Sequence, residues 1–441
     1  MKTKPVITFI GAGSTIFLKN LLGDVLLLDA LKDVRFNLYD IDALRLEESR
    51  QVIEALTRTI SGCRAEIGTY LGTLQRKEAL KGADFVINAV QVGGYEPATV
   101  TDFQIPEKYG LRQTIGDTLG IGGIFRGLRT IPVVLDLAED MEKVCPEAIL
   151  LNYTNPMAMV TGAVQTASHI ASVGLCHSVQ VCVPHLLESL NMTAENVRWK
   201  IYGINHMSWL LEVFDGGTDL YPEIRKRADE KNRKGIHDDM IRFEMMKYFG
   251  YYTTESSEHF SEYTPYWIRK DTPDLIGKFN IPLNEYPRRC IQNIEEWNSR
   301  KKSLLEGDSL IHEKTHEYGA DIINAVVTDS PYRFHGNILN TRGYISNLPG
   351  EAIVEIPCLA DRNGIQGVFA GSLPVQCAAL NQTNINVHLM TIEAALTRKK
   401  EAVYQAALLD PHTSAELNPE KIVALCDEML AAHKNWLPEY K

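Results

Sequence analysis

The amino-acid sequence predicts an α/β fold in which a Rossmann-like, doubly wound parallel sheet is followed by a second, helix-rich α+β domain. Three observations predict this fold. Short β-rich runs alternate with amphipathic helical segments through the first 200 residues. The first run, residues 6–10, leads directly into the turn Gly11-Ala12-Gly13. From about residue 200 onward, longer helical stretches replace the alternation.

Six short runs bounded by turn residues are predicted to be strands, namely Val6–Ile10, Val34–Tyr39, Ala65–Tyr70, Asp84–Val90, Ala148–Thr154 and Ser172–Cys176. Apolar residues recur at helical spacing between them, over Thr15–Ala30, Asp42–Thr59 and Gly127–Val144. Strands that alternate with helices form parallel sheets, because each crossover helix returns the chain to the same edge. The first half is therefore expected to be an open parallel sheet.

The second half has a different pattern. Helical spacing predicts helices over Asp238–Phe249, Ile291–Leu305 and Glu313–Ala325, and a strand-like piece covers Ala352–Cys358. The sequence has no internal repeat, low-complexity tract or flexible linker. We therefore expect two domains, residues 1–200 and 201–441, packed around a shared cleft as in lactate and malate dehydrogenases.

The composition is that of a large globular protein with an acidic balance. Of 441 residues, 45% are hydrophobic and 23% charged, and the formal net charge is −11. Nucleic acids and anionic membranes attract basic surfaces, so this charge argues against both as partners. No apolar run is long enough for a membrane span or a secretory signal. Eight cysteines without regular spacing are typical of reduced thiols, so we expect a cytoplasmic protein.

The turn after the first strand has the residues of a dinucleotide-binding loop. Gly11 permits a tight turn, and Gly13 lets backbone N–H groups approach a pyrophosphate at the start of the next helix, where Ser14 and Thr15 lie. The third glycine of the usual fingerprint is absent, because position 16 is Ile. The pattern predicts NAD binding, and the alternative is a structural turn.

Two acidic residues follow the second predicted strand. Asp40 lies where a carboxylate accepts hydrogen bonds from the ribose 2′-hydroxyl, which favours NAD over its phosphorylated form. In the alternative interpretation Asp40 caps a helix and Asp42 contacts the ribose.

Two later loops are candidates for substrate binding, because substrates bind at the carboxyl ends of such strands. After the fourth strand, Gln91-Val92-Gly93-Gly94-Tyr95 leads to a glycine-rich segment that starts at Asp117. After the fifth strand, Asn155 precedes Pro156. Its amide would bind nicotinamide or a substrate hydroxyl, or would only shape an Asn-Pro turn.

Thiol, imidazole and carboxylate groups occur later in the chain. Cys176 follows the sixth strand and His206 lies 30 positions further on, so no local zinc motif is present. From these residues alone, a buried thiol and a core histidine are favoured over metal ligands. The run 254–259 (TESSEH) and the pair Asp238 and Asp239 offer acid and base groups, or a solvated helix face.

Taken in chain order, these motifs closely resemble glycoside hydrolase family 4, and within it the bacterial α-galactosidase branch. The resemblance covers nearly all of the chain. The segments that carry it are 9–17 (FIGAGSTIF), 91–97 (QVGGYEP), 128–132 (LRTIP), 155–158 (NPMA), 174–180 (GLCHSVQ), 254–259 (TESSEH) and 382–386 (QTNIN). The missing third glycine agrees with this family, whose own pattern is Gly-x-Gly-Ser.

The resemblance implies a redox-assisted elimination instead of the two-carboxylate scheme of most glycosidases. In that reaction NAD takes a hydride from the sugar C3, a base removes the C2 proton, and the aglycone leaves from C1. Water then adds, and the hydride returns. The resemblance also makes Cys176 and His206 the protein ligands of a divalent cation, usually Mn²⁺, that the sugar chelates.

The resemblance leaves the base unsettled. Relatives that act on phosphorylated sugars have a tyrosine base near residues 254–259, where this chain has none. Four side chains are candidates, namely Glu255, Glu258, His259 and Tyr263. Asp117 corresponds to an acidic residue that tunes the base in relatives. His177 replaces an aspartate that serves as general acid in some relatives, so we expect it to contact the substrate near the scissile bond.

The implied substrate is a non-phosphorylated α-galactoside of the melibiose or raffinose type. Relatives that use 6-phosphorylated sugars have an arginine where this chain has Gln91, and a neutral amide binds a phosphate dianion poorly. We expect Gln91, Asn155 and His177 to bind the sugar. Residues 1–200 would bind NAD, and residues 201–441 would provide substrate, metal and oligomer contacts in a homodimer or homotetramer.

Three alternatives belong to other activities or classes. An NAD-dependent 2-hydroxy acid dehydrogenase shares the Rossmann half but would need no metal thiolate and would produce NADH. An α-glucosidase or α-glucuronidase of the same family would differ in the sugar. An NAD-sensing regulator is disfavoured, because the chain has no basic recognition helix.

Overall fold

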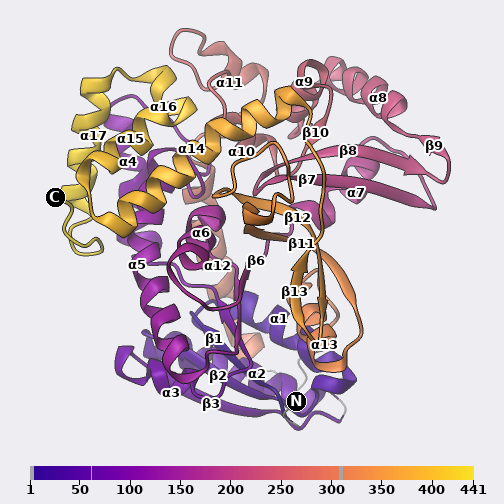
Figure 1. The fold of residues 1–441 in the computed structure, drawn as a ribbon, viewed down its shortest axis with the longest axis vertical. Helices are drawn as coiled ribbons and strands as arrows, with labels where there is room; N and C mark the ends of the chain where they lie inside the picture. Colours follow the sequence, from indigo (N-terminus) through magenta and orange to yellow (C-terminus); the bar gives the residue numbers. More distant parts are fainter. Residues whose placement is uncertain (1–3, 61, 307–310) are drawn as a thin grey trace.

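In a computed structural model that describes residues 4–60, 62–306 and 311–441, strands from both halves of the chain form one mixed sheet (Figure 1). Its parallel part has the order β3-β2-β1-β4-β5-β6. The strands are β1 (Val6–Ile10), β2 (Arg35–Asp40), β3 (Glu66–Leu71), β4 (Phe85–Asn88), β5 (Ile149–Asn152) and β6 (Ser172–Gly174). This is the strand order of a dinucleotide-binding fold, so the predicted fold class is confirmed.

Apolar residues explain the parallel strands. All four residues of β4 and of β5 are buried, as expected for strands covered on both faces. The connecting helices are α1 (Thr15–Leu27), α2 (Ala43–Thr59), α3 (Arg76–Leu80), α4 (Val100–Lys108), α5 (Gly120–Val144), α6 (Met157–Ala167) and α7 (Ser178–Ser189).

Helix α5 begins at Gly120, earlier than the predicted Gly127, so most of the glycine-rich segment is helical. The N-terminal end of α5 packs closely against the preceding loop. A Cβ on Gly122 would lie 2.4 Å from the Gly116 carbonyl oxygen, and one on Gly123 would lie 2.5 Å from the carbonyl carbon of Thr118. These glycines let the helix start press against the loop that carries Asp117.

The second half extends the sheet with antiparallel strands beside β6, in the order β11-β12-β7-β8-β10. The strands are β7 (Val197–Ile204), β8 (Met207–Asp215), β9 (Thr218–Asp219), β10 (Tyr252–Thr253), β11 (Tyr332–Leu339), β12 (Ile353–Asp361) and β13 (Gly364–Gly367). Of these, the sequence predicted β12 alone. Residue 200 falls inside β7, so the sheet continues across the expected domain boundary, and the division into two domains stays a prediction.

The helices of the second half are α8 (Tyr221–Lys234), α9 (Met240–Phe249), α10 (Ser257–Glu262), α11 (Asp274–Lys278), α12 (Glu285–Glu306), α13 (Gly319–Thr328), α14 (Val375–Thr397), α15 (Lys400–Leu409), α16 (Pro411–Glu416) and α17 (Pro419–Ala432). Several of them pack on the antiparallel strands, and α12 to α17 contact helices of the first half. Helix α13 begins six positions after the predicted Glu313, because residues 313–318 form a loop. Within the described part of the chain, no helix is both long and apolar enough to cross a membrane.

Candidate active site

The turn between β1 and α1 needs glycine at two positions. Gly11 has a φ of +87°, and a Cβ there would lie 2.8 Å from the Ala89 carbonyl oxygen. A Cβ on Gly13 would lie 2.9 Å from the Asp40 carboxylate, which accepts the Gly13 N–H at 2.6 Å. Ser14 is exposed at the start of α1, whereas the Thr15 hydroxyl is buried against Ser49 at 2.8 Å. The turn therefore presents backbone and the Ser14 side chain to solvent.

Asp40 and Asp42 have different tasks. Asp42 caps α2 by accepting the N–H groups of Leu44 and Arg45 at 3.0 and 3.1 Å. Asp40 lies at the carboxyl end of β2 and accepts three N–H groups, one of them from Gly13. The capping role therefore belongs to Asp42, and Asp40 lies directly beside the glycine turn.

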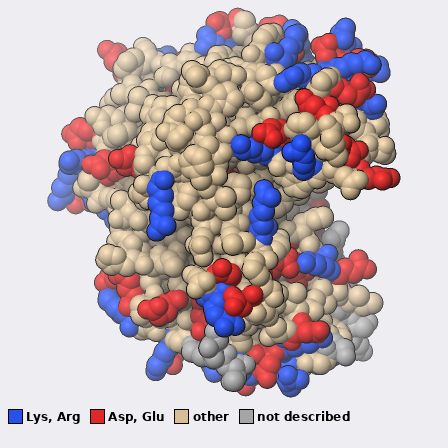
Figure 2. Space-filling view, turned by 45° about the vertical axis from the view of Figure 1, so that its right-hand side comes forward, with Lys and Arg blue, Asp and Glu red and all other residues tan. Residues whose placement is uncertain are grey.

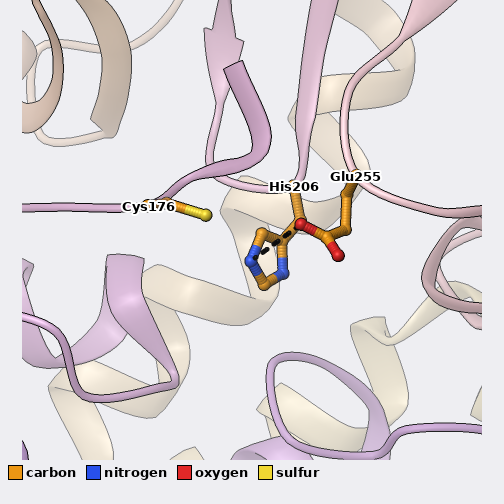
Figure 3. Close-up of side chains that lie close together, drawn as sticks. All are labelled: Cys176, His206 and Glu255. Carbon is orange, nitrogen blue, oxygen red and sulfur yellow. Dashed lines mark ion pairs between the residues drawn. The ribbon is translucent and has the colours of Figure 1, made fainter. Parts of the chain in front are cut away.

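Cys176, His206 and Glu255 converge at the carboxyl edge of the sheet (Figure 3). Cys176 lies just after β6, His206 in the two-residue turn between β7 and β8, and Glu255 just after β10. One sulfur, nitrogen or oxygen atom from each lies within 4.8 Å of the others. This is a set of soft and hard donors that suits a divalent transition metal.

The backbone at this cluster is unusual. His206 and Glu255 both have positive φ, at 62° and 68°. Side chains other than glycine seldom adopt this conformation, and it concentrates at functional sites. In both residues it aims a polar side chain into the cluster instead of toward solvent.

Neighbouring groups orient the His206 ring. Its Nδ1 shares hydrogen bonds with the Thr118 hydroxyl at 3.2 Å and the Tyr263 hydroxyl at 3.1 Å, which leaves Nε2 facing Glu255 at 3.6 Å. Burial lowers the pKa of His206, but the Cys176 sulfur and the Glu255 carboxylate outweigh it and raise that pKa to about 10. The Cys176 sulfur and the Glu255 carboxylate are groups that would also attract a cation.

Asp117 lies beside this cluster as a buried carboxylate. It accepts hydrogen bonds from the Asn155 amide at 3.0 Å and the Thr118 hydroxyl at 2.8 Å. Burial raises the pKa of Asp117, but Arg126 and two histidines hold it below its usual range. The Arg126 guanidinium also donates to the Asn155 carbonyl and the Tyr286 hydroxyl, so it fixes the position of Asn155, which donates to Asp117.

The structure separates the other base candidates. His259 packs edge-on against His206, and its Nδ1 lies 2.8 Å from the Ser256 hydroxyl. Burial outweighs the neighbouring carboxylates and lowers the pKa of His259 to about 4. Glu258 instead pairs with Arg289 at 2.6 Å. Tyr263 directs its hydroxyl at His206, and burial raises its pKa well above the usual value.

His177 follows Cys176 in the chain and is the residue directly before α7. Its Nε2 donates to the Glu317 carboxylate at 2.8 Å, and Tyr153 and Tyr318 flank its ring. The His177 side chain is 38% exposed, whereas that of Glu317 is 11% exposed. Glu317 therefore holds one ring nitrogen of His177, while part of the His177 side chain remains exposed to solvent.

Two other predicted groups have hydrogen-bond partners outside this cluster. Gln91 is exposed in the loop after β4, and its amide donates to the Thr99 hydroxyl at 3.3 Å. Asp239 bonds Arg242 and the Tyr252 hydroxyl, and Asp238 accepts from Asn280. The pair Asp238 and Asp239 therefore has structural partners.

Sequence reasoning missed Glu317 and Arg126. Glu317 comes from a loop between two helices and has no motif of its own, and Arg126 lies in an apolar helix segment. One sequence feature could have identified Arg126, because it is a charged residue inside an otherwise apolar run.

Comparisons with known proteins cover nearly all of the chain. A sequence model of family 4 glycosyl hydrolases matches residues 6–192, and that of the family's C-terminal domain matches residues 201–413. An α-galactosidase of Bacillus subtilis (strain 168) is 58% identical over 99% of both chains. One of Rhizobium meliloti (strain 1021) is 36% identical over 98% of this chain and 89% of its own.

A solved structure shares the fold. It is a 6-phospho-α-glucosidase from gut microorganisms in complex with NAD and Mn²⁺, with a TM-score of 0.78 and 22% identity. The match covers 99% of this chain and all of the other.

Proposed function

The chain belongs to glycosyl hydrolase family 4, and from this premise we propose that it is an α-galactosidase acting on non-phosphorylated α-galactosides such as melibiose and raffinose. The convergence of Cys176, His206 and Glu255 at the sheet edge carries the proposal. The 58% identity to the Bacillus subtilis α-galactosidase supports the choice of sugar.

The first turn fits NAD. Its two glycines leave space that a Cβ would fill, and the exposed start of α1 offers N–H groups to a pyrophosphate. Asp40 would accept the ribose hydroxyls, because a carboxylate has acceptor sites beyond the N–H groups that it already binds. The related 6-phospho-α-glucosidase structure holds NAD.

The cluster fits a divalent cation. Cys176 and His206 would hold it, and two protein ligands leave positions for the hydroxyls of a sugar. Tyr263 and Thr118 would fix the His206 ring through Nδ1, as partners of metal-bound histidines do. We propose Mn²⁺, the ion in the related 6-phospho-α-glucosidase structure.

When bound, the two groups supply a hydride acceptor and donor for the sugar C3 and a Lewis acid for the resulting ketone. We propose that Glu255 removes the C2 proton, because it is the one base candidate whose carboxylate lies in the cluster with Cys176 and His206. Burial raises the pKa of Glu255, but His206 and His259 outweigh it, so this carboxylate is ionised and able to accept a proton.

Asp117 is a second carboxylate beside the cluster, and it lies 3.9 Å from the Nε2 of His259. His177 would face the scissile bond and give a proton to the leaving oxygen, while Glu317 holds its ring in place. Asn155 donates one of its two amide N–H groups to Asp117, so its second N–H and its amide oxygen are the groups that it would offer to the sugar.

The loop after β4 supports a neutral sugar. Gln91 offers an uncharged amide there, whereas binding of a phosphate dianion calls for cationic donors. Hydroxyls pair well with an amide, which both donates and accepts.

We also propose self-association in a reducing compartment. Between Arg362 and Arg398 the chain has a single charged residue, Glu393, while Phe369 is 67% and Val375 81% exposed. Part of this segment, α14, crosses the front of Figure 1, and Figure 2 shows a broad face with few charged side chains. Each copy has a formal net charge of −11, so the electrostatic repulsion between two copies would be smallest if they met through such a face. All eight cysteines are free, as in the cytoplasm.

One assay tests the function. Hydrolysis of p-nitrophenyl α-galactoside is measured with NAD and Mn²⁺ added and withheld separately. We expect release of p-nitrophenol only when both are present, with NAD needed in catalytic amount. Stoichiometric NADH production from a 2-hydroxy acid, or hydrolysis without either addition by a protein shown to be free of both, would overturn the proposal.

A further inference from the structure

A buried ion pair lies beneath the loop that carries Gln91. Arg129 on α5 and Asp102 on α4 have side chains that are 0% and 2% exposed. The guanidinium donates to both carboxylate oxygens, at 3.0 and 2.5 Å. Such a pair gives little net stability compared with apolar residues of the same size, so its retention calls for another explanation.

The third donor of Arg129 leads to the loop. Its Nε donates to the Val92 carbonyl oxygen at 3.0 Å. The next residue, Gly93, has a φ of +80°, and a Cβ there would lie 2.4 Å from the Ala98 side chain. The conformation of the loop after β4 therefore requires glycine at position 93, and Arg129 connects this loop to helix α5.

The C-terminal part of the chain completes the arrangement. His433, just after α17, donates from Nε2 to Asp102 at 2.9 Å, and its ring stacks on Phe125. Three residues further on, the Trp436 ring lies 3.6 Å from the Cβ position of Gly93. Two contacts from one segment thus reach the loop, one through Asp102 and Arg129 and one directly.

We propose that Arg129, held in place by Asp102 and His433, is a positioning residue that sets the loop 91–94 and so aims Gln91 at the sugar. The inference deepens the proposed function and rests on it for its kinetic test. Only a guanidinium supplies three fixed N–H donors to a carboxylate and a carbonyl at once, so lysine cannot replace it.

The variant Arg129→Lys keeps the positive charge but loses the planar set of N–H donors that binds Asp102 and Val92 together. Its matched control is Arg76→Lys, because Arg76 donates to Asp140 at 2.7 Å, and Asp140 lies on the same helix α5 near its other end. We expect Arg129→Lys to raise KM for p-nitrophenyl α-galactoside about tenfold and to change kcat by less than about threefold. Arg76→Lys should lower Tm without changing KM.

Hydrogen exchange of segment 90–99 provides a readout that does not depend on activity. In the native loop the Gly94 N–H donates to the Gln91 carbonyl at 3.1 Å and the Ala98 N–H to the Gly93 carbonyl at 3.3 Å. These amides should exchange about tenfold faster in Arg129→Lys and at the native rate in Arg76→Lys. If the native protein hydrolyses no α-galactoside while this difference is seen, the proposed function fails but the positioning role stands.

A second variant guards against loss of folding. His433→Phe keeps the stacked ring and removes only the donor to Asp102. It should raise KM about threefold and accelerate exchange of segment 90–99. A folded Arg129→Lys or His433→Phe protein with native KM and native exchange in this segment would overturn the inference.

Discussion

His206 Nε2 and Glu255 Oε2 lie 3.6 Å apart, although one belongs to the turn after β7 and the other follows β10. The Cys176 sulfur joins them from the end of β6. Three segments of the sheet edge thus bring a thiol, an imidazole and a carboxylate to one point, which is the geometric basis of the proposed metal-assisted reaction.

Replacing Cys176 tests the metal site. Cys176→Ser should abolish divalent-cation-dependent turnover and leave the Kd for NAD within about twofold, because a hydroxyl is a poor substitute for a thiolate ligand. Cys63→Ser, at another partly exposed thiol, is the control and should be fully active. Native activity of metal-free Cys176→Ser protein would disprove the metal site.

Replacing Glu255 tests the base. Glu255→Gln should lower kcat at least about 100-fold and weaken Mn²⁺ binding by less than about tenfold, because the amide cannot accept the C2 proton. Glu258→Gln should cost less than about threefold, since Glu258 is paired with Arg289 away from the cluster. Complete loss of Mn²⁺ binding in Glu255→Gln would reassign Glu255 as a metal ligand.

The two aspartates after β2 make a matched pair. Asp40→Ala should weaken NAD binding by about 1–2 kcal/mol, the scale of a lost charge-assisted hydrogen bond. Asp42→Ala should instead lower the free energy of unfolding by about 1 kcal/mol through loss of the α2 cap, with NAD affinity unchanged. Calorimetric titration and thermal unfolding of both variants separate the roles, and the reverse assignment would make Asp42 the ribose contact.

Substrate choice is tested at Gln91. The native protein should cleave melibiose and p-nitrophenyl α-galactoside at least about tenfold more efficiently than their 6-phosphates, a gap of about 1.4 kcal/mol in kcat/KM. Gln91→Arg should narrow the gap, because arginine adds a charged, bidentate donor. A native preference for the phosphorylated sugars, or for α-glucosides, would place the chain in another branch of the family.

The sequence was sufficient for the parallel half of the fold. The bounds of β1 agree with the prediction to the residue. The glycine turn and Asp40 lie together as expected, because the parallel pairing of β1 with β2 places the carboxyl ends of both strands side by side. The hairpin of β7 and β8 was missed, since β7 has a polar start and its turn residues, Asn205 and His206, are not a common hairpin pair.

The site was predicted less completely, for a related reason. Cys176 and His206 come together because the antiparallel strands extend the parallel sheet beyond β6. Glu255 points into the same cluster because its backbone has a left-handed conformation, which no sequence pattern predicts. Family resemblance, not spacing, identified the first two. Glu317 reaches His177 from a loop far along the chain, so only the folded structure reveals their contact.

The most direct test of the elimination reaction is the position of deuterium in the product. The protein, with NAD and Mn²⁺, is allowed to hydrolyse p-nitrophenyl α-galactoside in D₂O, and the galactose is examined by NMR and mass spectrometry. Removal of the C2 proton by a base, followed by its return from solvent, predicts deuterium at C2. Galactose that carries only protium at C2 after full turnover would contradict the account and indicate direct displacement at C1.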